Sequence, residues 1–157
     1  MGVTWVRRFS VMLILGLMTA AAYAVDLTDD DAGLVRGNVQ STDYSALVKI
    51  ERITRSGPPS GYATWFYEAT VLEGWYGPKL DQISFRQTVE ADMSVRVPKK
   101  PQIVSLCRSQ ERGYYIPDNG FMLPATKHLE AVARQTGKMR RHQPVTRKGK
   151  SDTSWCQ

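Results

Sequence analysis

Hydrophobic and polar residues alternate along the middle of the chain, which predicts a series of β-strands. The first alternating segment covers residues 44–51, and a longer one covers residues 62–72. The remaining predicted strands lie at 83–86, 93–97 and 102–108, with a short strand or hairpin around the turn at 117–120. Residues 102–108 are apolar on both faces, so we expect this strand at the centre of the sheet.

The segments on either side of these strands have different patterns. Residues 124–137, "PATKHLEAVARQTG", predict a helix that begins after a proline and stops at Gly137. Residues 25–43 begin with the acidic run "VDLTDDDAG", which we interpret as a solvated lead-in or a single helical turn. We therefore predict a mainly β domain at 44–137: a small, closed or nearly closed antiparallel barrel with a C-terminal helix.

The first residues of the chain have the three-part form of a secretory signal peptide. Arg7 and Arg8 precede an apolar run at 11–18, and small residues lead up to Ala24. We predict cleavage after Ala24 and a periplasmic or secreted protein of residues 25–157. The alternatives are a membrane anchor, for which the apolar run is short against the roughly twenty residues needed, and a twin-arginine signal from "VRRFS". No later segment of the sequence could span a bilayer.

Positive charge is concentrated near the C-terminus. The formal net charge is +6, yet residues 25–137 hold 13 basic and 14 acidic residues. Residues 138–157 form a basic tail, which we interpret either as a solvated segment or as a binding site for anionic envelope polymer or lipid. Nucleic acid is not the partner we expect. The candidate polyanion-binding residues are Lys138, Arg140, Arg141, Arg147, Lys148 and Lys150.

The chain has two cysteines, Cys107 and Cys156. In an oxidising compartment they allow a single intramolecular disulfide. Closing that loop would stabilise the fold by roughly 4 kcal/mol in the chain-entropy model. Two free thiols or an intermolecular bridge are the alternatives. Because Trp155 precedes Cys156, we predict that the chain end docks back on the barrel.

The order of strands and turns resembles a known class of secreted proteins. The segments that carry this resemblance are "ALVKIERI", "YEATVLEGWYGP", "DQISF", "QIVSLC" and "GYYIPDNG". Over about residues 44–120 the chain resembles the five-stranded OB-fold barrels of the netrin and tissue-inhibitor-of-metalloproteinase class. The resemblance implies an OB-like fold. The inhibitors of this class present an N-terminal cysteine to the protease zinc, whereas Val25 would begin this mature chain, so no inhibitory residue is carried over.

Candidate catalytic groups are few, and none forms a recognised constellation. A Cys107–His128 pair would need a free thiol, and Glu68 and Glu73 fall on opposite faces of one strand. No zinc-protease, phosphate-loop or dinucleotide motif is present in the sequence. Two cysteines and two histidines do not have metal-ligand spacing, and consecutive aspartates at 29–31 lack the alternate spacing of a calcium loop. We predict no cofactor, no metal and no enzymatic activity.

A binding role remains, and aromatic residues are its best candidates. Such side chains at a barrel rim stack on a ligand or on a protein partner, although they also serve to cover the ends of a barrel. We predict an exported, non-catalytic binding module that recognises a protein partner, as an inhibitor or accessory subunit; polyanion binding through the tail is the alternative. The candidate partner-binding residues are Phe66, Trp75, Tyr76, Tyr114 and Tyr115.

Overall fold

The computed structural model describes residues 27–111, 113–142 and 156. The described elements are α1 (Leu27–Ser41), β1 (Tyr44–Ser56), β2 (Tyr62–Tyr76), β3 (Gln82–Glu90), β4 (Gln102–Ser109), β5 (Gly113–Tyr115), β6 (Met122–Pro124) and α2 (Lys127–His142). The expected signal peptide and its cleavage point after Ala24 lie outside these residues. Neither described helix has the length and apolar character needed to cross a membrane.

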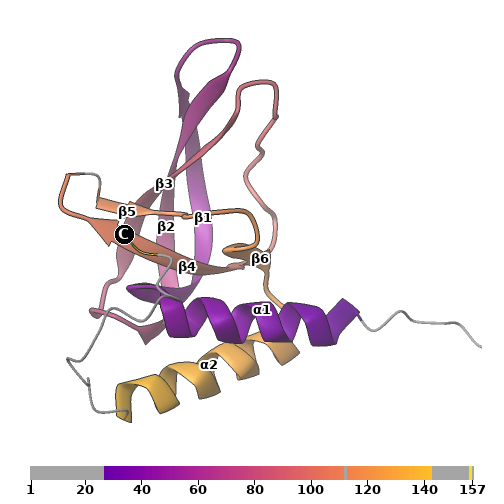
Figure 1. Cartoon of the computed structure of the whole chain (residues 1–157), viewed down its shortest axis with the longest axis vertical. Helices are drawn as coiled ribbons and strands as arrows, with labels where there is room; N and C mark the ends of the chain where they lie inside the picture. Colours follow the sequence, from indigo (N-terminus) through magenta and orange to yellow (C-terminus); the bar gives the residue numbers. More distant parts are fainter. Residues whose placement is uncertain (1–26, 112, 143–155, 157) are drawn as a thin grey trace, which may run out of the picture.

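Five of the strands close into a barrel, in the order β1-β2-β3-β5-β4, with β4 pairing back to β1 (Figure 1). β6 is an extra strand that pairs with β4. The barrel is mixed because β3 and β5 run parallel, while its other pairs are antiparallel. The predicted mainly β, five-stranded, OB-like barrel with a C-terminal helix is thus confirmed, but it is not antiparallel throughout as predicted, because β3 and β5 are parallel.

The barrel interior is filled by the apolar face of each alternating strand. Tyr67 of β2 and Phe85 of β3 stack there with ring centroids 4.9 Å apart. Tyr44 of β1 is fully buried, and burial is the main reason that its pKa rises to about 12. Both strands that carry apolar residues on two faces, β4 and the first half of β1, are buried on both sides. One side faces the barrel interior, and the other lies under the helices.

The two helices pack along one another against the outside of the barrel (Figure 1). Between them and the sheet lies a second core, which consists of Ala32, Val35, Val39, Leu47, Trp75, Ile103, Leu129 and Ala133. Its α1 members have a spacing that puts them on one helix face. The predicted solvated lead-in is therefore wrong for residues 27–41, which form a helix with a buried face.

Two further details differ from the sequence pattern. Residues 93–97 form no strand, and Met93 and Val97 are exposed. Helix α2 also does not stop at Gly137 but continues to His142. Gly137 is a buried residue within α2. A Cβ atom at this position would lie 2.5 Å from the carbonyl oxygen of Trp75. The glycine is needed for close packing and not as a helix terminator.

Candidate binding site

Three side chains form a row across the outer face of β2, β3 and β5. Phe66 is the cross-strand neighbour of Arg86, and Arg86 is the neighbour of Tyr115. The adjacent residues Tyr67 and Phe85 point into the barrel, where both are buried. Because successive side chains of a strand point to opposite faces, Phe66, Arg86 and Tyr115 point away from the core. We call these three residues the outer row.

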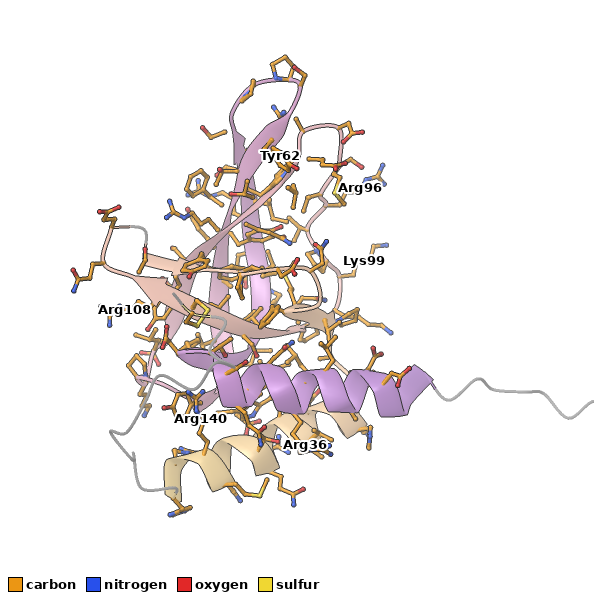
Figure 2. The ribbon with its side chains drawn as sticks, viewed as in Figure 1. Arg36, Tyr62, Arg96, Lys99, Arg108 and Arg140 are labelled. Carbon is orange, nitrogen blue, oxygen red and sulfur yellow. A yellow bond between two sulfur atoms is a disulfide. The ribbon has the colours of Figure 1, made fainter. Side chains whose placement is uncertain are left out.

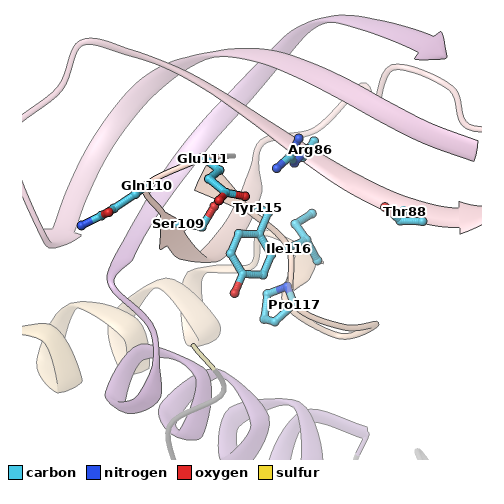
Figure 3. A pocket seen from close by; sticks show the side chains of 8 residues that line it. All are labelled: Arg86, Thr88, Ser109, Gln110, Glu111, Tyr115, Ile116 and Pro117. Atoms are coloured by element: carbon cyan, nitrogen blue, oxygen red, sulfur yellow. The ribbon is translucent and has the colours of Figure 1, made fainter. Parts of the chain in front are cut away.

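Arg86 and Tyr115 of the outer row line an open hollow of about 510 Å³. Its walls come from β3, from the end of β4 with the turn that follows, and from β5 with the residues after it (Figure 3). The side chains that line it include Arg86, Thr88, Gln110, Glu111, Tyr115 and Pro117. The hollow therefore combines hydrogen-bonding groups with an aromatic ring and a proline ring.

Arg86 is the most unusual group in this hollow. Its Nη2 atom is buried and has no hydrogen-bond partner among the described residues. Glu111 also lines the hollow, yet the ion pairs of the described chain do not join it to Arg86. A buried donor without an acceptor costs free energy, so a ligand that brings a carboxylate or carbonyl oxygen to Arg86 would gain by satisfying it.

The structure places two of the five predicted aromatic residues at this site. Phe66 is 41% exposed on β2, and Tyr115 is half-buried and lines the hollow. They flank Arg86 on its two sides.

The other three predicted aromatic residues lie elsewhere. Trp75 is only 1% exposed and belongs to the second core, so it is not available to bind a partner at a barrel rim as predicted. Tyr114 packs against Tyr44, with ring centroids 5.3 Å apart. Tyr76 is half-buried, and the guanidinium carbon of Arg140 lies 3.6 Å from its ring centroid. These three rings mainly hold the fold together.

The basic residues near the C-terminus also separate into groups. Lys138 and Arg141 are exposed on α2, whereas Arg140 on the same helix is half-buried. Part of the expected tail is therefore helical. The other predicted polyanion-binding residues, Arg147, Lys148 and Lys150, lie outside the described residues.

Arg140 joins the two helices and is not a free cation. Its Nη1 atom donates to the carbonyl oxygen of Val39 at 2.7 Å and to that of Thr42. These carbonyls lie at the C-terminal end of α1, where backbone acceptors lack helical partners and a positive charge is favourable. Burial lowers the pKa of Arg140 from its usual value, and Tyr76 stacks on its guanidinium group. The predicted role of Arg140 in polyanion binding conflicts with these contacts.

Replacing Arg140 with glutamine is expected to lower the free energy of unfolding by about 2–3 kcal/mol, because charge-assisted hydrogen bonds and a cation–π contact are lost. Arg141→Gln is the matched control, since Arg141 is exposed on the same helical turn, and it is expected to change stability by less than about 0.5 kcal/mol. Urea unfolding followed by circular dichroism measures both. Equal stabilities for the two variants would contradict a structural role for Arg140.

The two cysteines form the predicted disulfide, with Cα atoms 5.1 Å apart. The chain end at Cys156 is therefore attached to β4, and Cys107 offers no thiol to His128, which is exposed on α2. The Asp43 carboxylate lies close to both sulfurs. Disulfide sulfurs are not thiolates, so this group of three does not form a metal site.

Comparison with known proteins adds no relative. The chain matches no protein-family model, and no curated protein matches it by sequence. The resemblance to the netrin and metalloproteinase-inhibitor class therefore stays a prediction.

The sequence interpretation missed Arg86 as a site residue. In the sequence it is one polar residue in an alternating strand. Phe66 lies on a different strand and is distant from Arg86 in the sequence. Only the register between β2 and β3 brings the two side chains together.

Proposed function

We propose that this protein is a non-catalytic binding protein that recognises a protein partner through the outer row. The observation that carries the proposal is the buried Nη2 atom of Arg86, which has no hydrogen-bond partner among the described residues. In the sheet, Arg86 lies between Phe66 and Tyr115. Arginine and large aromatic residues supply much of the binding free energy at protein interfaces. A carboxylate or carbonyl oxygen of the partner would complete the hydrogen bonding of Arg86.

The place of the outer row in the barrel supports this proposal. OB-folds commonly bind their oligonucleotide and oligosaccharide ligands on the face of the second and third strands, beside the loop between the fourth and fifth, so this face is a recurrent binding surface of the fold. The outer row lies on β2, β3 and β5, and the turn after β4 supplies Gln110 and Glu111 to the hollow. A carboxylate also lines the hollow, at Glu111, which makes a highly charged polyanion a poorer match for it.

We further propose that the protein works in the periplasm or outside the cell. The signal-peptide pattern that ends at Ala24 supports export. The Cys107–Cys156 disulfide is compatible with an oxidising location outside the cytoplasm.

Affinity capture from envelope extract tests the function. The chain is immobilised as wild type, as Arg86→Gln and as Phe66→Ala, and proteins retained at moderate salt are identified by mass spectrometry. The binding of each retained protein is then measured with purified components. We expect both variants to weaken binding about tenfold or more. Arg86→Gln deprives the acceptor of the partner of its charged donor, and Phe66→Ala removes an aromatic contact.

Two control variants make the same kinds of change outside the outer row: one removes an arginine charge and the other removes an exposed apolar side chain. Arg36→Gln alters an exposed arginine on α1, distant from the end of the molecule where Tyr62 lies (Figure 2). Met139→Ala alters an exposed apolar residue on α2. Partner binding that is unchanged in Arg86→Gln and Phe66→Ala would refute the role of the outer row. Retention that disappears with added salt, and is lost when residues 138–157 are deleted, would instead favour polyanion binding through the tail.

A further inference from the structure

One edge of β3 is only partly paired. β2 pairs with β3 from Gln82 to Glu90, whereas β5 pairs with it only at Phe85 and Arg86. After Ile116, whose N–H donates to the Arg86 carbonyl at 2.9 Å, the chain turns away towards β6. Within the described residues, no strand lies beside the last four residues of β3 on that side.

The backbone groups on this free edge follow from the alternation of the strand. Since the Arg86 carbonyl faces β5, the N–H and C=O groups of Thr88 and the N–H of Glu90 face the same edge. The intervening residues Gln87 and Val89 face β2. The Glu90 carbonyl accepts from the N–H of Met93 at 3.2 Å. Two donors and one acceptor at Thr88 and Glu90 thus have no backbone partner among the described residues.

A second hollow, of about 390 Å³, runs beside this edge. It lies between β3 and the turn that follows β5, and it shares Thr88, Ile116 and Pro117 with the hollow at Arg86. The two hollows therefore adjoin one another at these three residues, and we call them together the groove. At its far end lie two exposed apolar side chains, Tyr62 at 68% and Met93 at 53% exposure.

Charges along the groove are arranged from one end to the other. The unpaired guanidinium nitrogen of Arg86 lies at one end. The carboxylates of Glu90 and Asp118 line the other end. Glu111 also lines the Arg86 end, exposed and not ion-paired with Arg86. A ligand that fits this pattern has an anionic group at Arg86, and apolar and basic groups towards Glu90.

We propose that an extended segment of a protein partner adds to the free edge of β3 as an extra strand. Its backbone pairs with Thr88 and Glu90, its acidic residue or terminal carboxylate binds Arg86, and its apolar side chain contacts Tyr62 and Met93. Strand addition of this kind takes affinity from main-chain hydrogen bonds and specificity from the side-chain pockets. Arg86 and Glu90 are four residues apart, about 13 Å along a strand, so the added segment is about five residues long. The inference rests on the proposed function, because it names how that partner is held.

The probe is a set of linear twelve-residue peptides selected by phage display on the chain with its disulfide formed. Amide hydrogen exchange, measured by NMR with and without a selected peptide, reports each backbone group. We expect the amides of Thr88 and Glu90 to exchange quickly in the free protein and to slow at least about tenfold on binding. The amides of Gln87 and Val89 should be protected in both states, because they face β2.

A pair of variants at one position isolates the backbone group. Thr88→Pro removes the outward N–H, and edge positions of this kind accept proline, so the peptide should bind about tenfold or more weakly. Thr88→Val keeps the N–H and should bind within about twofold of the wild type. If Thr88→Pro does not fold, replacing successive amides of the peptide by esters serves instead, since only alternate peptide N–H groups would face β3.

The outcomes separate the two proposals. Peptides that depend on Arg86 and Phe66, but bind Thr88→Pro normally and leave the amides of Thr88 and Glu90 unprotected in the wild type, would refute strand addition and leave the outer row in place. Peptides that depend on neither Arg86 nor Thr88 would refute both. Selection of no peptide above background, or occupation of the groove by a second copy of the chain in sedimentation experiments, would refute strand addition by a partner.

Discussion

Trp75→Ala is expected to lower the free energy of unfolding by about 3–5 kcal/mol, as is typical when a large buried aromatic residue is truncated. Trp75 lies at 1% exposure where α1, α2 and the barrel meet. The second core contains residues of α1, α2 and the barrel. A shift of one of these elements would therefore not fill the cavity left by the missing indole ring. Gly137 packs directly on its backbone, close enough that a Cβ atom would collide with the Trp75 carbonyl.

Two further variants make the Trp75 experiment specific. Trp75→Phe keeps an aromatic ring in the second core and leaves a smaller space than alanine does, so it should cost clearly less than alanine. Phe66→Ala removes an exposed ring and should cost about 1 kcal/mol or less. All are compared by urea unfolding followed by circular dichroism. If Trp75→Ala were as mild as Phe66→Ala, the second core would not be a main source of stability.

The second large effect is expected from the disulfide. Breaking Cys107–Cys156 should lower the free energy of unfolding by about 4 kcal/mol, because the bridge closes a loop with a sequence separation of 49 and limits the unfolded chain. The bridge also holds the chain end beside the helices: the Cys156 sulfur lies 3.7 Å from the carbonyl oxygen of Ser41, the last residue of α1.

Guanidinium unfolding of three samples tests the disulfide: the oxidised chain, the reduced chain, and the double variant Cys107→Ala/Cys156→Ser. The reduced chain and the double variant should agree with one another. Adding reductant to the double variant should have no effect, which controls for the reductant itself. A difference below about 1 kcal/mol between oxidised and reduced chains would mean that the loop is already restricted by the packing of α1 and α2.

The candidate site could be predicted only in part. Phe66 and Tyr115 were accessible to sequence reasoning because aromatic residues on the polar face of a strand, or next to a turn, are unusual enough to notice. Trp75 had the same local appearance, yet it is buried, since what covers it are helices from distant parts of the chain. Arg86 had no distinguishing sequence context at all. We include Arg86 in the site because Phe66 and Tyr115 are its cross-strand neighbours. Its buried Nη2 atom also has no hydrogen-bond acceptor among the described residues.

The sequence was enough to predict β1, β2, β3 and β4 and a buried face of each, because alternation of side chains is a property of each strand alone. It also indicated the cysteine pair, since two cysteines allow one intramolecular bridge. The helix at 27–41 was missed because its first turn is acidic and its apolar residues are few. Those apolar residues are buried because they pack against α2 and Trp75.

Three other features depend on the tertiary structure. Residues 93–97 form no strand, Arg140 binds the end of α1, and no described strand pairs with the end of β3 beyond Arg86 on the β5 side. Each depends on which distant segments meet. The physical reason is that a local pattern sets the direction of a side chain or backbone group, whereas its partner is set by register and packing across the whole chain.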